Sequence, residues 1–246
     1  MSITSKIEWT EATWNPITGC TKCSAGCEHC YAATLAKRLH AMGNIRYTNG
    51  FKVTVHRDLF ERPLTWTKPK MIFVNSMSDI FHEDVADEDI LKIFETMNKA
   101  HWHTFQVLTK RPERLAKLNS LITWTPNIWM GVTVENRKAI TRCDILRKCD
   151  AHIKFISAEP LLESIKDINL SGIDWLIVGG ESGAGCRPLD KQWVIELRDI
   201  AVEKGVPFFF KQWGGFHHSK AGSELDGVTY KEFPNASCPS GGQKAD

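Results

Sequence analysis

The sequence predicts an α/β fold, a partial or full TIM-like (β/α) barrel with mostly parallel strands and an irregular C-terminal extension. Two observations predict it. Short apolar segments bounded by polar, Gly or Pro residues alternate with amphipathic segments at helical spacing. Polar side chains directly follow the apolar segments, as expected where the carboxyl ends of barrel strands converge on one face. In an open sheet the same side chains would instead spread along a line.

The predicted elements follow one another along the whole chain. A short β-like stretch at 13–19 would form the first strand, and 32–42 has the composition of a helix. Later strands are predicted at 70–79, 104–112, 127–136, 153–162, 174–183 and 206–215. The helices between them are predicted at 87–100, 111–121, 137–149 and 190–205. The strands are apolar throughout, which is typical of parallel strands buried on both faces.

Composition divides the chain near residue 216. Residues 1–216 form the predicted barrel, and residues 217–246 form a C-terminal extension and tail. Within the extension, 217–234 is rich in Gly, Ser and Lys and is predicted to be irregular. Residues 235–246 are predicted to be a mobile tail.

The overall composition is that of a soluble globular protein, with 42% hydrophobic and 24% charged residues. A formal net charge of +2 neither requires nor excludes a nucleic-acid partner. The N-terminal stretch lacks the apolar segment of a signal peptide, and no apolar run is long enough to span a membrane. We therefore expect a cytoplasmic protein without membrane contact. There thiols stay reduced, so clustered cysteines indicate metal or redox chemistry more often than disulfides.

Residues 20–31 read CTKCSAGCEHCY, so that Cys20, Cys23, Cys27 and Cys30 share one polar loop. Two C-x2-C pairs would suit zinc, although only three residues separate the pairs, fewer than in common zinc modules. Four closely spaced thiolates would also suit an iron–sulfur cluster. In a third interpretation, three thiolates hold a [4Fe–4S] cluster and leave one iron open. The C-x3-C-x2-C spacing of Cys23, Cys27 and Cys30 resembles that of radical S-adenosyl-L-methionine (SAM) enzymes, in which the open iron binds SAM.

The resemblance extends well beyond this loop. The string IEWTEATWNPITGC…GCEHCYA resembles the start of a phage and prophage protein family of unknown function that is grouped with radical SAM barrels. It continues through HTFQVLTKRPER, FISAEPLL, IVGGESGAGCRP and PFFFKQWGG, and so covers almost the whole chain. A looser resemblance, in the Cys-Tyr-Ala ending of the loop, is to spore photoproduct lyase and its relatives. The resemblance implies an enzyme that uses a [4Fe–4S] cluster, SAM and an external electron donor, with a nucleotide or nucleic acid as the candidate substrate.

The family pattern has three cysteines spaced C-x6-C-x2-C, which correspond to Cys20, Cys27 and Cys30. The radical SAM spacing favours Cys23 in place of Cys20. The resemblance favours Cys20, with Cys23 as a substitute or fourth ligand. Tyr31, the aromatic residue after the last cysteine, is expected beside the cofactor.

The predicted cofactor site includes residues that follow several strands. An anion suits the ammonium group of SAM, so Ser78 and Asp79 in the segment NSMSD, together with Asn75, are candidates. Asp79 alternatively caps a short helix at 80–84. The backbone of Gly179 and Gly180 would approach the adenosine or ribose.

Other polar and aromatic side chains follow the later strands. Trp213 would either stack on a base or adenine, or belong to the core. Lys110 or Arg111 would pair with the SAM carboxylate. The predicted catalytic set is Glu135, Glu159, Glu181, Lys110 and Lys211. These glutamates would bind an amino-bearing substrate or a second metal, or the lysines would simply neutralise them.

Two other functions remain open at this stage. One is a non-enzymatic barrel whose cysteine loop holds zinc or a structural iron–sulfur cluster and which binds nucleic acid or protein. The other is a hydrolytic barrel that uses another metal at its acidic glutamates.

Overall fold

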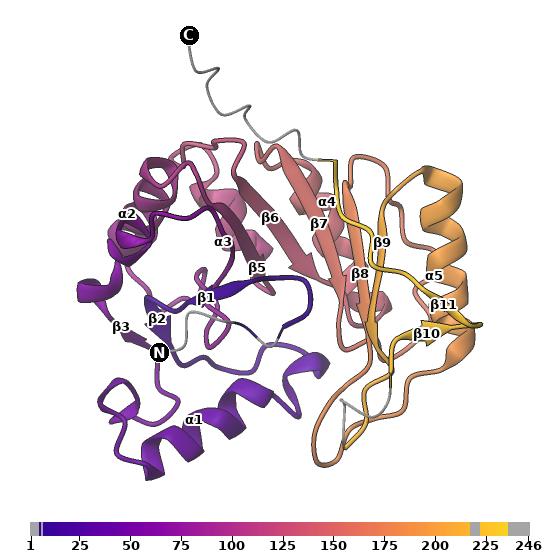
Figure 1. The fold of residues 1–246 in the computed structure, drawn as a ribbon, viewed down its shortest axis with the longest axis horizontal. Helices are drawn as coiled ribbons and strands as arrows, with labels where there is room; N and C mark the ends of the chain where they lie inside the picture. The colour runs from indigo at the N-terminus through magenta and orange to yellow at the C-terminus, as the bar shows by residue number, and fades with distance from the viewer. Residues whose placement is uncertain (1–4, 6, 217–221, 236–246) are drawn as a thin grey trace, which may run out of the picture.

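The computed structural model describes residues 5, 7–216 and 222–235. Seven strands form one parallel sheet in the order β1-β4-β5-β6-β7-β8-β9 (Figure 1). They are β1 (Ala12–Trp14), β4 (Met71–Val74), β5 (Thr104–Thr109), β6 (Ile128–Thr133), β7 (Ile153–Ala158), β8 (Trp175–Gly179) and β9 (Phe208–Gln212). Within the described residues β1 does not pair with β9, so the sheet is a half-barrel. The predicted α/β class is confirmed, in its partial-barrel form.

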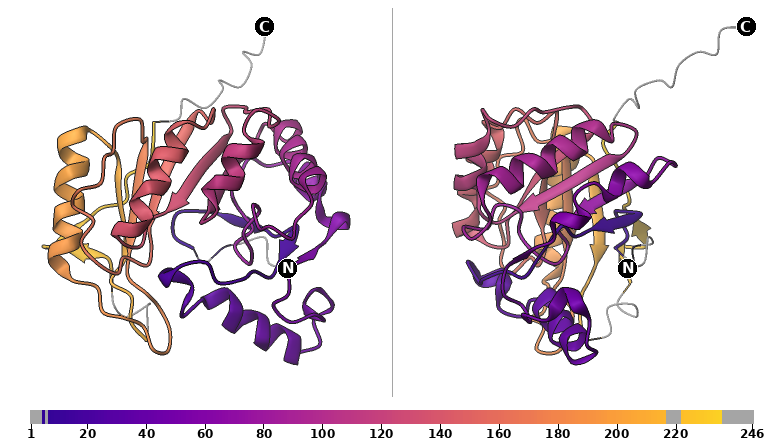
Figure 2. Two further views of the ribbon diagram at one scale, coloured as in Figure 1. Left: turned by 180° about the vertical axis from the view of Figure 1, so that it is seen from behind. Right: turned by 90° about the vertical axis from the view of Figure 1, so that its left-hand side faces the viewer.

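Five α-helices occupy the predicted positions: α1 (Tyr31–Ala41), α2 (Asp87–Lys99), α3 (Pro112–Leu118), α4 (Thr141–Arg147) and α5 (Lys191–Lys204). Helices α2 to α5 cover one face of the sheet, whereas α1 lies apart from them, beside the cysteine loop (Figure 2). The connection from β7 to β8 contains turns and no helix, so the β/α alternation is interrupted there. No helix in the described part of the chain is long and apolar enough to cross a membrane.

Short elements complete the chain. Strands β2 (Ile17–Thr18) and β3 (Thr54–Val55) form a separate antiparallel pair. The 3-10 helices are η1 (Ala25–Cys27), η2 (Ile45–Tyr47), η3 (Arg57–Leu59), η4 (Arg62–Thr65) and η5 (Arg137–Ile140). The predicted first strand is therefore divided. Only β1 joins the main sheet, and the chain then turns through β2 into the cysteine loop.

Aromatic rings fill the uncovered, concave face of the sheet. Trp175 is fully buried and contacts the rings of Trp9, Trp129, Phe155 and Phe209 at centroid distances of 5.8–6.4 Å. These residues alternate with residues of the larger core, which lies between the sheet and the helices. The rings occupy the concave face toward the beginnings of the strands, so the remaining space lies toward their carboxyl ends.

Part of the C-terminal extension is regular, contrary to the prediction. Strands β10 (Glu224–Leu225) and β11 (Val228–Thr229) form a hairpin, and the chain then pairs with β9. The amide of Phe210 donates to the carbonyl of Tyr230 at 3.0 Å, and the indole of Trp175 donates to the carbonyl of Glu232 at 2.8 Å. The segment is ordered because its main chain supplies partners for β9. The predicted mobile tail lies outside the described residues except at position 235.

Candidate functional site

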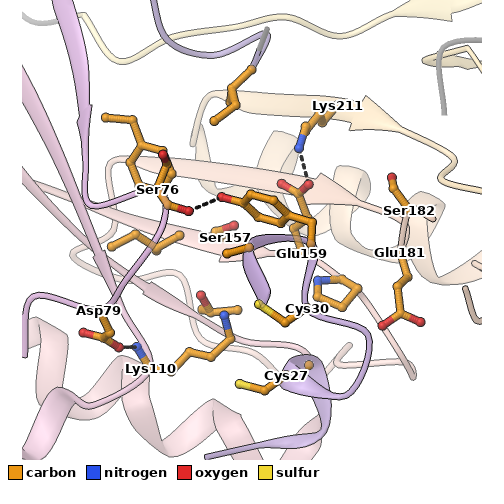
Figure 3. Close-up of a pocket in the computed structure, with 18 of the residues that line it drawn as sticks. Cys27, Cys30, Ser76, Asp79, Lys110, Ser157, Glu159, Glu181, Ser182 and Lys211 are labelled. Carbon is orange, nitrogen blue, oxygen red and sulfur yellow. Dashed lines mark hydrogen bonds and ion pairs between the residues drawn. The ribbon is translucent and has the colours of Figure 1, made fainter. Parts of the chain in front are cut away.

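A cavity of about 710 Å³ lies at the carboxyl ends of the sheet strands (Figure 3). Its wall includes the cysteine loop, the start of α1 and residues at or just past the carboxyl ends of β4 to β9. The following predicted residues line it: Cys20, Cys27, Cys30, Tyr31, Asn75, Ser78, Asp79, Lys110, Glu159, Gly180, Glu181 and Lys211. The structure therefore brings residues from distant parts of the sequence to one site. Cys23, Glu135, Gly179 and Trp213 do not line it.

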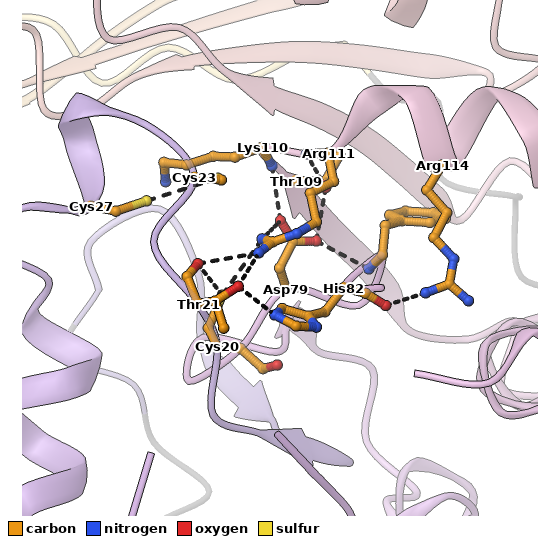
Figure 4. Close-up of polar contacts among 12 residues, drawn as sticks. Cys20, Thr21, Cys23, Cys27, Asp79, His82, Thr109, Lys110, Arg111 and Arg114 are labelled. Carbon is orange, nitrogen blue, oxygen red and sulfur yellow. Dashed lines mark hydrogen bonds and ion pairs between the residues drawn. The ribbon is translucent and has the colours of Figure 1, made fainter. Parts of the chain in front are cut away.

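The four sulfur atoms of the cysteine loop do not converge on one point. Cys20, Cys27 and Cys30 line the cavity, whereas Cys23 is exposed and its Sγ lies 4.0 Å from Cys27 Sγ (Figure 4). Among the described residues, no three His, Cys, Asp or Glu side chains form a ready-made metal site. The loop thus presents thiols of the right chemistry to the cavity, and a bound metal would have to draw them together.

The pKa values of Cys20 and Cys27 shift in opposite directions. A hydrogen bond with Cys23 and the nearby Lys110 ammonium lower the pKa of Cys27 to about 4. Desolvation raises the pKa of Cys20, and the Arg111 guanidinium partly offsets this effect. The side chain of Lys110 extends toward Cys23 and Cys27 in Figure 4 and forms no ion pair in the part of the chain that the structure describes.

Arg111 anchors the beginning of the cysteine loop. Its Nη2 donates to the carbonyl oxygen and Oγ1 of Thr21, at 3.1 and 2.9 Å, and its Nη1 lies 3.6 Å from Cys20 Sγ. The guanidinium is held by Glu83 at 2.8 Å and by Asp79 at 3.4 Å. A planar guanidinium offers several donors in fixed directions, so Arg111 sets the position of this part of the loop.

Two further predicted cofactor residues are engaged in contacts that shape the cavity wall. Ser78 Oγ donates to the carbonyl of Gly19, at 2.6 Å, just before Cys20. Asp79 accepts from Thr109 Oγ1 at 2.8 Å and from the amides of Phe81 and Lys110 at 3.0 and 2.9 Å. No helix forms at 80–84, so the carboxylate of Asp79 caps a turn and joins the ends of β4 and β5.

Arg187 lies in the segment after β8 and contacts the end of the cysteine loop. It donates to the carbonyl of Ala25 at 3.0 Å and to Glu28 at 3.1 Å, and its Nε donates to Glu181 at 2.9 Å. His29 Nδ1 lies 3.0 Å from the same Glu181 carboxylate. The sequence reasoning missed Arg187. Opposite charges on either side of the glycine-rich turn in GGESGAGCRP are the signal that would have indicated it.

Glu135 does not line the cavity, and its predicted catalytic role stays a prediction. It is fully buried and accepts a hydrogen bond from Arg142 at 2.7 Å. A Cβ atom on Gly26 would lie 3.4 Å from the Glu135 side chain, so Glu135 packs behind the cysteine loop. Arg142 pairs with Oε2 of this carboxylate, whereas Oε1 has no hydrogen-bond partner among the described residues.

Trp213, predicted either to stack on a ligand or to belong to the core, does not line the cavity. Its indole donates to the carbonyl of Glu224 at 2.9 Å and its ring packs on Phe210, so it belongs to the contact with the C-terminal hairpin. Gly180 lies against this residue, because a Cβ there would be 2.1 Å from Trp213 O. Gly180 is thus required by a close backbone contact.

Glu159 and Lys211 form an ion pair across β8 on the cavity wall (Figure 3). A Cβ atom on Gly179 would lie 3.5 Å from both side chains, so the glycine leaves the space in which they meet. Both side chains are about one-fifth exposed. The lysine neutralises the glutamate here, as in one of the predicted interpretations of these charged residues.

Comparison with protein families matches residues 4–234 to a family described as "Protein of unknown function (DUF5131)". The chain belongs to the DUF5131 family. That description names no phage, so a phage origin stays a prediction.

A comparison of the DUF5131 chain with characterised proteins finds no match. Among solved structures, it is similar to "Spore photoproduct lyase complexed with dinucleoside spore photoproduct", with 14% sequence identity and a TM-score of 0.48. The alignment covers 81% of the DUF5131 chain and 63% of the other chain. The chain therefore spans less than two thirds of the length of that structure.

Three buried polar atoms of residues that line the cavity have no hydrogen-bond partner among the described residues. They are Trp9 Nε1, Asn75 Nδ2 and Thr133 Oγ1. Asn75 has a φ of 58°, a left-handed conformation that is uncommon for a residue other than glycine. Unsatisfied buried groups and unusual backbone conformations concentrate at binding sites, so this part of the wall is suited to a polar ligand.

Glu181 is expected to give the DUF5131 protein a pH-dependent stability. Burial alone would raise its pKa, but hydrogen bonds from Arg187 and His29 lower it to about 2. A carboxylate with a lowered folded-state pKa stabilises the fold above its unfolded pKa, and this contribution is lost as the pH falls toward the folded value. We expect wild type to exceed Glu181→Gln in free energy of unfolding by about 2–3 kcal/mol at pH 6.

Urea denaturation between pH 6 and pH 3 measures this difference. The advantage of wild type should shrink below about pH 4.5, where the unfolded carboxyl begins to bind a proton. The exposed Glu61 supplies the control variant Glu61→Gln. A difference between wild type and Glu181→Gln that stays constant over this range would contradict the assignment.

Proposed function

We propose that the DUF5131 protein is a radical SAM-type iron–sulfur enzyme. It would reductively cleave SAM and act on a substrate of the nucleotide or nucleic-acid class. The observation that carries this proposal is that three of the four loop cysteines line one cavity, together with polar residues at or just past the carboxyl ends of six parallel strands. The cavity volume lies within the range of about 300–1,000 Å³ that is usual for ligand pockets.

Cys20, Cys27 and Cys30 would hold the cluster, because their residues line the cavity and Cys23 does not. Thiolates are the ligands that iron–sulfur clusters prefer. When bound, the cluster supplies the electron that breaks a carbon–sulfur bond of SAM. Arg111 and Arg187 hold the two ends of the loop, so the chain itself determines which thiols reach the cavity.

The remaining wall residues would position SAM and the substrate. Lys110, which has no carboxylate partner in the described part of the chain, would bind the SAM carboxylate. Asn75 and Thr133 would contribute their unpaired polar atoms to the same ligand. Tyr31 donates its hydroxyl proton to the Ser76 carbonyl and so presents its ring to the cavity. The Glu159–Lys211 pair would contact the polar edge of the substrate, and the electron would come from an external donor.

Electron paramagnetic resonance tests the proposal directly. Anaerobically reconstituted protein, reduced with dithionite, should show a [4Fe–4S]⁺ signal that changes when SAM is added, and it should release 5′-deoxyadenosine. An intact cluster that is indifferent to SAM and yields no 5′-deoxyadenosine would refute the proposed activity. One equivalent of zinc without iron after anaerobic purification would favour the non-enzymatic alternative.

Serine substitutions distinguish the cysteines. Cys20→Ser, Cys27→Ser and Cys30→Ser should each reduce bound cluster at least about tenfold, because each removes a ligand. Cys23→Ser should retain wild-type iron content, as should Cys186→Ser outside the loop. Iron and sulfide analysis of the purified variants measures the effect. Loss of the cluster in Cys23→Ser with retention in Cys20→Ser would assign the alternative set of three.

A further inference from the structure

Cys23 has no role in the proposed site, yet it lies beside one of its residues. The side chain is exposed and does not line the cavity. Its Sγ nevertheless lies 4.0 Å from Sγ of Cys27, which does line the cavity. A disulfide requires a sulfur–sulfur distance of about 2.0 Å, so rotation of the two side chains would have to close a gap of about 2 Å.

The local backbone keeps the two thiols close. Helix η1 (Ala25–Cys27) forms a single turn between them. This turn is held from outside, since Arg187 binds the carbonyl of Ala25 and Arg111 binds Thr21 ahead of Cys23. The segment that carries both cysteines is therefore anchored at both ends, while the exposed Cys23 side chain is free to change its rotamer.

We propose that Cys23 and Cys27 are a redox pair that closes a disulfide within the loop when the cluster is absent. The pairing of Cys23 with Cys27 is argued only from the distance between their sulfur atoms and from the anchored backbone. Its consequence rests on the proposed function, because a disulfide at Cys27 would remove one cluster ligand and block loading until it is reduced. Cys23 would then act as a redox-sensitive lock on cluster assembly.

A small-molecule disulfide such as glutathione disulfide is the required oxidant. The exposed Cys23 sulfur attacks one glutathione sulfur and releases the first glutathione thiol. The Cys27 sulfur then attacks the Cys23 sulfur of the mixed disulfide and releases the second. The two protein thiols lose two protons and two electrons, and the glutathione disulfide becomes two glutathione molecules. Exposed disulfides are readily reduced again by thiols, which makes the lock reversible.

Among the described residues, the other cysteines are placed differently from this pair. Cys20 is held beside Arg111, and Cys143 and Cys149 are buried in the core. Cys30 lies at the start of α1, where it precedes the first helical residue. Cys186 lies on the segment after β8, outside the loop.

Peptide mass spectrometry of the full chain tests the pair. Iron-free protein is reduced, desalted, incubated with glutathione disulfide, alkylated and digested with trypsin. Cleavage after Lys22 separates Cys20, in peptide 7–22, from the other three loop cysteines, in peptide 23–37. Peptide 23–37 should carry a single alkyl group. Apart from this group, its mass should be two hydrogens lower than that of the reduced, unalkylated peptide. Fragment ions should assign the bond to Cys23 and Cys27. Cys186→Ser should behave like wild type, and Cys23→Ser should lack the bond.

Several outcomes would overturn the pair. These are a crosslink between peptides 7–22 and 23–37, a bond that includes Cys30, a stable glutathione adduct on Cys23, or full alkylation of all three thiols.

Cluster loading tests the consequence separately. Oxidised wild type should take up about tenfold less cluster than the same sample after dithiothreitol, because one ligand is blocked. Cys23→Ser exposed to the same oxidant should load equally before and after reduction. A disulfide that forms without affecting loading would overturn the lock. Reduced wild type that takes up no cluster would refute the proposed function and leave the mass-spectrometric result standing.

Discussion

Gly180→Ala is expected to lower the free energy of unfolding by about 2–4 kcal/mol, because the added methyl group would overlap main-chain atoms. A Cβ at this position would lie 2.1 Å from the carbonyl oxygen and 2.6 Å from the carbonyl carbon of Trp213. Neither atom belongs to a flexible side chain, so the contact is relieved only by separating the segments that follow β8 and β9. Urea denaturation followed by circular dichroism measures the loss.

Gly179→Ala is the matched control, one residue earlier, at the end of β8. The atoms nearest to its Cβ would belong to the Glu159 and Lys211 side chains, at an ordinary contact distance of 3.5 Å. We expect a change of less than about 1 kcal/mol. The pair also tests the original expectation that both glycines contact adenosine. If both variants keep wild-type stability and bind SAM equally weakly, the glycines serve the cofactor and the packing argument is wrong.

Arg111→Lys is expected to lose cluster binding while the fold is retained. Lysine keeps the positive charge but cannot donate at once to Thr21, Glu83 and Asp79, as the guanidinium does. Without these contacts Cys20 is no longer fixed at the cavity, and we expect at least about tenfold less cluster, as for other residues that orient ligands.

Iron content, the reduction potential of the residual cluster and the circular dichroism spectrum together measure the Arg111 effect. Arg198→Lys is the matched control, since Arg198 also pairs with a carboxylate, that of Asp199, and does not line the cavity. Unchanged iron content and potential in Arg111→Lys would show that the loop is positioned without this residue. A shifted potential with normal iron content would indicate that Arg111 acts through its charge on the sulfur atoms.

The sequence pattern was sufficient for most of the fold. Apolar strands such as 104–109 and the amphipathic helix at 87–99 follow local rules, and the structure confirms both. Closure of the barrel was not predictable, because it depends on whether β1 pairs with β9, two strands nearly 200 residues apart. The hairpin at 224–229 was also missed, since its strands are only two residues long and have no periodic pattern.

The sequence predicted which residues lie near the carboxyl ends of the strands. It could not predict which of these side chains point into the cavity. Glu135 and Glu159 both follow strands by one or two residues, yet only Glu159 lines the cavity. Side-chain direction alternates only while the strand continues, and the turn beyond it sets a new direction. The sequence also could not show that Ser78 and Asp79 are engaged by the cysteine loop and by β5, because these contacts join segments far apart in the chain.

The segment that pairs with β9 also bears on how the molecule avoids self-association. An open sheet presents a row of free amide and carbonyl groups at each edge, which can template pairing with another chain. Strand β9 contains three consecutive phenylalanines, the kind of sequence that favours such pairing. Hydrogen bonds between Tyr230 or Glu232 and β9 occupy part of that edge. The C-terminal segment therefore covers part of an edge that a closed barrel would not have.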